Sequence, residues 1–220
     1  MEPVTTTGDP MALEIERRFL VKGSGWRDRV CWQARLSQGY LCSGEDGFTL
    51  RVRLSAAEPG ARPSSAQPLE QAWLTIKAAL PTASAPASAA NCSAPSAQAL
   101  TRLEFEYAIP LADGQQLLNL AGSHLAKRRY GLDLPDGVWV VDVFEAENAP
   151  LVVAEVELPH ADAAFNRPDW CGAELTGWHQ LSNAALAQHP LNRWSAPERE
   201  ALLAGKPLWR GAVVRGEGRG

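Results

Sequence analysis

Residues Leu13–Val21 read LEIERRFLV, and this stretch decides the fold because apolar and charged side chains alternate along it. Successive side chains of a β-strand point to opposite faces, so Glu14, Glu16 and Arg18 share one face and most of the apolar residues share the other. Such a two-faced strand is typical of an antiparallel sheet. The stretch therefore predicts a strand with a carboxylate-rich face.

The same alternation continues along the chain and predicts about eight strands in all. Besides the first, they are Gly39–Cys42, Phe48–Leu54, Gln71–Ala78, Arg102–Ile109, Leu125–Tyr130, Val138–Phe144 and Val152–Leu158. Helices are predicted near Asp113–Leu125, with Asp113 as the N-cap, near Leu181–Gln188 and at Pro197–Ala204.

The 220-residue chain is long enough for one well-buried domain, and 45% hydrophobic with 21% charged residues is an ordinary globular balance. Two segments rich in Ala, Ser and Pro predict flexible loops between strands. The expected organisation is a flexible leader at 1–11, a domain at 12–190 with flexible loops at 55–70 and 79–100, and a tail with a short helix at 191–220.

Several classes of protein are disfavoured by composition. A net charge of −4 argues against general attraction to nucleic acid or to an anionic membrane. The four cysteines form no CxxC pair, which disfavours a zinc site or a disulfide framework. The chain shows neither a secretory signal nor an apolar run of about 20 residues. A cytoplasmic protein is therefore expected.

The charged faces of the predicted strands carry both signs in pairs. Two carboxylates at positions i and i+2 lie about 6–7 Å apart along a strand and repel unless a cation or proton lies between them. Hard divalent cations prefer such oxygen ligands, and paired bases suit phosphate oxygens. The acids are Glu14, Glu16, Glu104, Glu106, Asp142, Glu155 and Glu157, and the bases are Arg18, Arg51, Arg53, Lys77, Arg102, Lys127 and Arg129.

Two structures accommodate this pattern. In a β-sandwich the charged faces are merely solvated, and no triphosphate ligand is expected. In a closed barrel the same side chains meet in a shared lumen, which is costly unless water and ligands compensate the charges. The grouping of acids as E-x-E and of bases as R-x-R or K-x-R favours the lumen.

The segments also resemble the CYTH, or triphosphate tunnel metalloenzyme, superfamily over about residues 11–190. Residues 14–21 resemble the family's opening E-x-E-x-K strand, and later motifs follow in the family's order. These are Gln38–Leu41, Arg51–Arg53, Leu74–Lys77, Glu104–Glu106, Lys127–Tyr130, Asp142–Phe144, Ala154–Glu157, Trp170–Thr176 and Ser182–Asn183.

The resemblance implies an α+β fold, in which an eight-stranded antiparallel barrel holds a triphosphate with Mg²⁺ or Mn²⁺ and helices pack outside. It implies catalytic roles for Tyr40, Glu155 and Glu157, although Tyr40 also fits a packing role at a strand end. The metal ligands would be Glu14, Glu16, Asp142, Glu155 and Glu157. The substrate-binding residues would be Arg18, Arg51, Arg53, Lys77, Glu104, Glu106, Lys127 and Arg129.

The expected activity is metal-dependent hydrolysis of inorganic tripolyphosphate to pyrophosphate and phosphate. Thiamine triphosphate hydrolysis and class IV adenylyl cyclase activity are alternatives, as is a polyphosphate-binding module without catalysis. Arg18 stands where the family usually has Lys. The Arg preserves the positive charge, but unlike Lys it cannot lose its proton. The partner is a small-molecule triphosphate, with no nucleic acid or membrane, and the sequence leaves a homodimer open.

Overall fold

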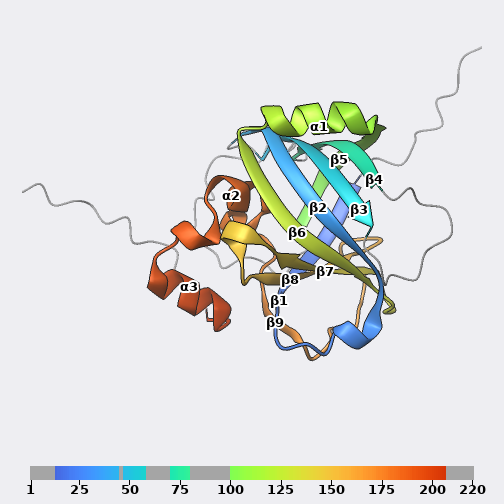
Figure 1. Ribbon diagram of the computed structural model, residues 1–220. Coiled ribbons are helices and arrows are strands. Elements are labelled where there is room, and N and C mark those ends of the chain that lie inside the picture. The colour runs from blue at the N-terminus through green and yellow to red at the C-terminus, as the bar shows by residue number, and fades with distance from the viewer. Residues whose placement is uncertain (1–12, 45–46, 58–69, 80–99, 207–220) are drawn as a thin grey trace, which may run out of the picture.

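The computed structural model describes residues 13–44, 47–57, 70–79 and 100–206, which form one antiparallel sheet flanked by short helices (Figure 1). The strands are β1 Leu13–Val21, β2 Val30–Ser43, β3 Thr49–Ala57, β4 Glu70–Ala78, β5 Leu100–Ile109, β6 Ser123–Leu132, β7 Val138–Phe144, β8 Val152–Glu157 and β9 Cys171–Glu174. The α-helices are α1 Leu111–Leu120, α2 Asn183–Gln188 and α3 Ala196–Leu203, and 3₁₀ turns occupy η1 Arg27–Arg29, η2 Ala146–Asn148, η3 His179–Leu181 and η4 Leu191–Arg193.

The sheet closes on itself. Its order is β5-β4-β3-β2-β6-β7-β8-β1-β9, and an additional pairing joins β5 to β1. Leu13 faces Leu103 and Glu14 faces Arg102 across that seam. Because β9 pairs with β1 outside the ring, eight of the nine strands form the barrel. The predicted eight-stranded barrel is confirmed, and the open sandwich is excluded.

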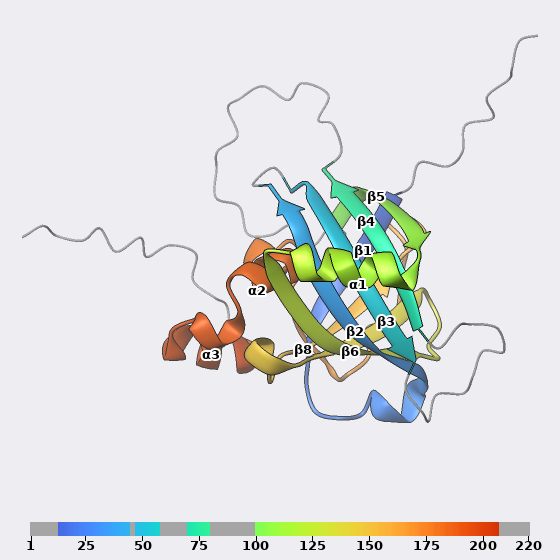
Figure 2. The same cartoon turned by 45° about the horizontal axis from the view of Figure 1, so that its top comes forward.

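Helix α1 covers the outside of the barrel where it crosses β2, β3 and β4 (Figure 2). The close approach depends on glycine: a Cβ on Gly114 of α1 would lie 2.4 Å from Ala72 Cβ on β4. A Cβ on Gly39 of β2 would likewise lie 2.6 Å from Ala121 Cβ. Real Cβ atoms do not approach so closely, so both positions require glycine for this packing.

An apolar cluster closes one end of the barrel. Leu20, Leu125 and Val153 follow the lumen-facing alternation of β1, β6 and β8 and pack against residues that follow β9. The cluster includes Leu175, Leu181, Leu186, Leu191, Trp194 and Leu202. The segment from η3 to α3 is therefore packed into the core, and its first part lies under the barrel. We call the whole apolar cluster the floor.

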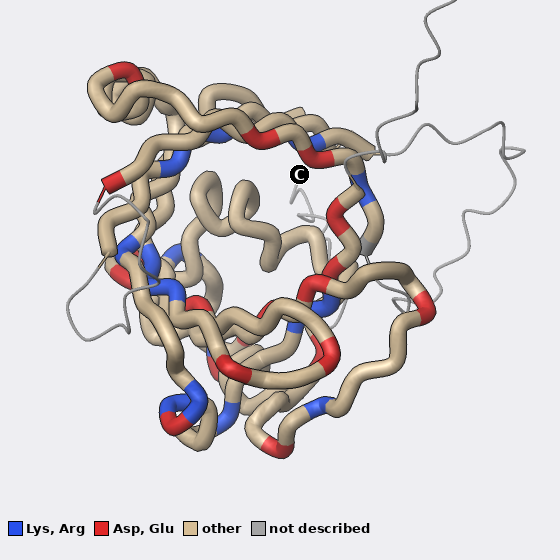
Figure 3. Tube along the Cα trace, turned by 90° about the vertical axis from the view of Figure 1, so that its right-hand side faces the viewer, with Lys and Arg blue, Asp and Glu red and all other residues tan. Residues whose placement is uncertain are grey.

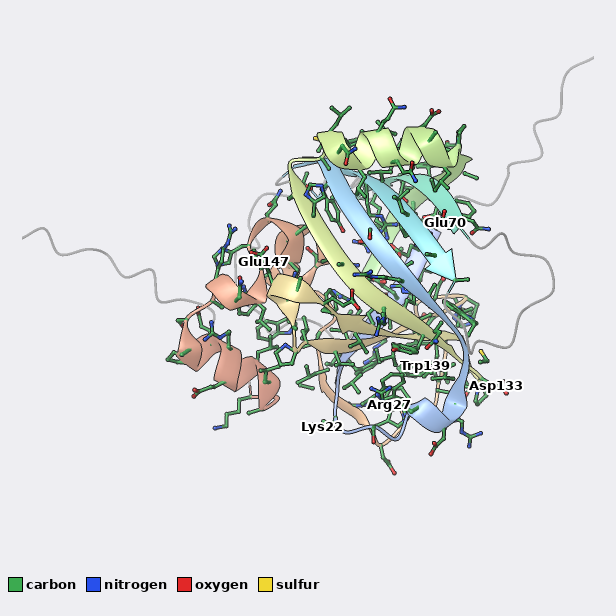
Figure 4. The ribbon with its side chains drawn as sticks, in the orientation of Figure 1. Lys22, Arg27, Glu70, Asp133, Trp139 and Glu147 are labelled. Atoms are coloured by element: carbon green, nitrogen blue, oxygen red, sulfur yellow. The ribbon has the colours of Figure 1, made fainter. Side chains whose placement is uncertain are left out.

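A second apolar cluster lies on the outer face of β1, β7 and β8. Trp139 packs there at 2% exposure (Figure 4). The centroid of a Trp139 ring lies 5.8 Å from that of Phe165 and 6.0 Å from that of Trp170. These large apolar rings are therefore buried on the outside of the barrel, away from its charged lumen. Trp139 and Trp194 are both buried and serve as packing residues.

Several predicted boundaries differ from the structure. Strand β2 has 14 residues rather than the four predicted, and β9 was not predicted as a strand. Helix α1 begins at Leu111 after Pro110, so Asp113 is not its N-cap. Ser55–Ala57 belong to β3 rather than to a loop. The predicted leader and most of both predicted loops lie outside the described residues. No helix in the described part of the chain is long and apolar enough to cross a membrane.

Candidate active site

Charged residues occur on strands all around the ring (Figure 3), and many of their side chains line the lumen. Directly opposed residues of an antiparallel pair point to the same face, so the register carries the charged face from strand to strand. A cavity of about 380 Å³ results. It is lined by Leu13, Glu14, Glu16, Arg51, Arg53, Lys77, Arg102, Glu104, Glu106, Arg129, Glu155, Glu157 and Asn183.

Glu14 is held by two bases from neighbouring strands. Lys77 Nζ donates to both carboxylate oxygens at 2.7 Å, and Arg102 Nε donates to Oε2 at 2.6 Å. Burial raises the pKa of Glu14, but Lys77 and Arg102 outweigh it and lower this pKa to about 2. Glu14 is therefore ionised at neutral pH and offers negative charge to the cavity.

The cavity wall formed by β3 carries arginines supported by Glu106. Arg53 Nη2 lies 2.9 Å from Glu106, and Arg51 Nη2 lies 3.0 Å from the hydroxyl of Thr75. That hydroxyl donates to Glu106 Oε1 at 2.9 Å. Glu104 lies 3.2 Å from Lys77 and 3.7 Å from Arg51. Glu104 and Glu106 thus orient the wall bases. Thr75 helps by linking Arg51 to Glu106, a role that was not predicted although Thr75 shares the face of Lys77.

A second group of ion pairs lies deeper, around Asp142. This fully buried carboxylate accepts from Lys127 Nζ and from Arg129, whose Nε and Nη2 each lie 2.7 Å from one of its oxygens. Arg129 Nη2 also donates to Glu155 Oε2 at 2.6 Å. Burial lowers the pKa of Lys127 to about 8 despite Asp142. Asp142 and Lys127 lie behind the cavity wall, whereas Arg129 and Glu155 reach it.

Arg18 connects this group to the floor. Its Nε donates to Glu155 Oε1 at 3.0 Å, and its Nη1 donates to the Leu181 carbonyl at 2.9 Å. The side chain is 6% exposed and stands behind the cavity wall. The planar guanidinium of Arg18 therefore donates to Glu155 and to the floor at the same time. A Lys at this position would offer a single ammonium group instead.

Three buried arginine nitrogens lack a hydrogen-bond partner within the described residues: Arg18 Nη2, Arg51 Nε and Arg53 Nε. A buried donor without a partner is destabilising, and such groups are few in folded proteins. Guanidinium N–H groups match the oxygens of phosphate. An anion bound beside these groups would satisfy donors that the protein leaves open.

Glu16 lies among other carboxylates. It pairs with Glu157 across the β1–β8 register, and Glu155 and Glu14 are nearby. Burial, then Glu155 and then Glu14 raise the pKa of Glu16. A cation placed among these oxygens would relieve the repulsion, and oxygen-only donors suit a hard divalent ion. The residues therefore fit Mg²⁺ or Mn²⁺, although no ready-made group of three His, Cys, Asp or Glu ligands occurs in the described residues.

Tyr40 and Asn183 differ in their position relative to the cavity. Tyr40 is 5% exposed, does not line the cavity, and donates its hydroxyl to Gln38 Oε1 at 3.3 Å. Burial raises the pKa of Tyr40, which opposes ionisation of the phenol. Asn183 of α2 lines the cavity and accepts from Lys127 at 3.3 Å. Asn183 belongs to the Ser182–Asn183 motif, but the sequence predicted no role for it.

Two curated proteins are similar to this chain in sequence along most of its length. The inorganic triphosphatase of Nitrosomonas europaea is 32% identical over 178 residues, covering 79% of this chain and 96% of that protein. The inorganic triphosphatase of Acetivibrio thermocellus is 29% identical over 182 residues, covering 82% and 96%. A solved inorganic triphosphatase structure shares 28% identity over 79% of this chain and 93% of its own, with a TM-score of 0.47. No family model matches the chain.

Proposed function

We propose that this chain hydrolyses inorganic tripolyphosphate to pyrophosphate and phosphate with a divalent metal ion. The premise is that the chain belongs to the CYTH family, together with these inorganic triphosphatases. The observation that carries the proposal is the lumen itself. Arg51 and Arg53 line it, and each has a buried Nε donor without a partner within the described residues, which phosphate oxygens would satisfy. The clustered carboxylates of the lumen suit a hard cation.

The bases of the wall would bind and orient the substrate. Arg51, Arg53 and Lys77 line the cavity from β3 and β4, and Arg129 lines it from β6. Fixed positive charge already in place stabilises the negative charge that shifts between phosphate oxygens during transfer. Glu104 and Glu106 support this wall. Arg18 and Lys127, which stand behind it, would add positive charge at the inner end.

The carboxylates would divide into two roles. Glu14 and Glu16, with Glu155 and Glu157, would hold Mg²⁺ or Mn²⁺, which when bound neutralises the charge of the phosphate chain. Glu155 is ionised, because Arg129, Lys127 and Arg18 outweigh the effect of burial and lower its pKa. Its carboxylate, or that of Glu157, could accept a hydrogen bond from the attacking water and orient it. Asp142 would act by fixing Lys127 and Arg129.

The floor would control how the substrate enters. The packed apolar residues of the floor would block one end of the barrel, and a phosphate chain would then enter through the other. The enclosed inner end excludes bulk water, which strengthens the interactions between the lumen charges and the phosphates.

The test is phosphate release from tripolyphosphate with Mg²⁺ or Mn²⁺, comparing wild type with Glu14→Gln and Glu155→Gln. The matched control is Glu145→Gln, because Glu145 forms its ion pairs with Arg35 and Arg128 outside the lumen. Metal-dependent release that both lumen substitutions abolish and the control retains is the expected result. ATP and thiamine triphosphate in parallel identify an organic substrate. Binding of tripolyphosphate without release from any substrate would refute the hydrolase and support a binding module.

A further inference from the structure

Arg102 is a cavity cation to which the proposed reaction assigns no role. It stands on β5 directly opposite Glu14 of β1, at the seam that closes the barrel. Its Nε donates to Glu14 Oε2 at 2.6 Å, and its Nη2 donates to Glu16 Oε1 at 3.2 Å. One guanidinium therefore bridges the two carboxylates that, in the proposed function, hold the divalent cation.

A divalent cation held by Glu14 and Glu16 would compete with Arg102 for Glu14 Oε2 and Glu16 Oε1. Glu14 Oε2 already accepts from both Lys77 and Arg102, so its lone pairs are engaged. A cation that coordinates Glu14 and Glu16 must weaken or replace the contacts of Arg102, since both bind by positive charge at the same atoms. The metal and the guanidinium are competitors.

The surroundings of Arg102 leave room for its guanidinium to move away from Glu14 and Glu16. Its side chain is 25% exposed, whereas that of Lys77 is 10% exposed, and it lines the cavity. A displaced guanidinium would therefore remain in the space that the substrate enters. There it would meet phosphate oxygens, which it can bind in the bidentate manner it uses for carboxylates.

We propose that Arg102 is an exchangeable counter-ion, which holds Glu14 and Glu16 until a divalent cation takes their oxygens and then turns to the anionic substrate. This inference rests on the proposed function. Its consequence is thermodynamic coupling. The metal alone binds weakly, because displaced Arg102 has lost its partners, and an anion that offers new partners strengthens metal binding. By linkage, the metal strengthens anion binding by the same factor.

The test measures Mn²⁺ affinity from the electron paramagnetic resonance signal of free Mn²⁺, with no triphosphate present and therefore no turnover. Wild type is compared with Arg102→Gln at constant ionic strength, with and without sulfate as the anion. Arg17→Gln is the matched control, because Arg17 forms a similar fork with Glu174 at 23% exposure but outside the barrel. Arg102→Gln should bind Mn²⁺ about tenfold more tightly, the factor that one charge-assisted hydrogen bond corresponds to.

Sulfate should tighten Mn²⁺ binding in wild type and in Arg17→Gln, and this gain should be lost in Arg102→Gln. Unchanged or weaker Mn²⁺ binding by folded Arg102→Gln would overturn the inference while leaving the proposed function intact. If that variant does not fold, Arg102→Lys decides. It keeps the charge but loses the bridge from one guanidinium to both Glu14 and Glu16, so its Mn²⁺ affinity should rise by a smaller factor. An Mn²⁺ affinity equal to that of wild type overturns the inference. Wild type that binds no Mn²⁺ even with sulfate would overturn both proposals.

Discussion

Replacing Leu186 by Ala tests whether the floor is a packed part of the barrel. Leu186 of α2 is 0% exposed and lies in the cluster with Leu20, Leu125 and Val153. The substitution removes three buried carbons, worth about 2 kcal/mol in transfer free energy at about 0.8 kcal/mol each. The cavity left behind adds to this, because the surrounding strands relax only in part. We expect a loss of about 3 kcal/mol in the free energy of unfolding.

The assay is urea denaturation followed by tryptophan fluorescence, with the midpoint and slope fitted together. Leu120→Ala is the matched control, because Leu120 is a helical leucine that is 75% exposed. It should change stability by less than about 0.5 kcal/mol. If Leu186→Ala cost no more than the control, the floor would not be the packed element described above, and the claim that the barrel has a single entrance would fail with it.

Three further outcomes are expected. Tyr40→Phe should keep most of the activity, because the phenol is buried and off the cavity wall; a fall in kcat of about 100-fold or more would instead make Tyr40 a catalytic acid or base. Gly114→Ala should lower Tm, because the new Cβ would lie 2.4 Å from that of Ala72. Such overpacking lowers the free energy of unfolding by about 1–3 kcal/mol, so an unchanged Tm would contradict the described packing. In variants with one cysteine retained, Cys42, which is exposed, should react rapidly with a thiol reagent at pH 8. Cys171 should react only on unfolding, since burial raises its pKa to about 12; equal rates would refute this.

The order of residues along the chain determined the strands and their charged faces. Alternation is a local property, so Leu13–Val21 and Val138–Phe144 were predicted with the bounds that the structure has. The long strand β2 was predicted as only four residues, because in Val30–Ser43 the lumen-facing positions are partly apolar and the pattern that marks a strand is weak.

Only the tertiary structure decided how the charges are paired. Arg102 and Glu14 are separated by 88 residues, and Arg18 and Glu155 by 137, so no local pattern could pair them. Their contacts follow from the closure of β1 on β5 and from the β1–β8 register, which depend on hydrogen bonds between distant segments. The floor has the same origin. Nothing in the local sequence around Leu181 and Leu186 indicates that they pack under a barrel. They lie there because the burial of apolar surface drives the segment after β9 under the strands.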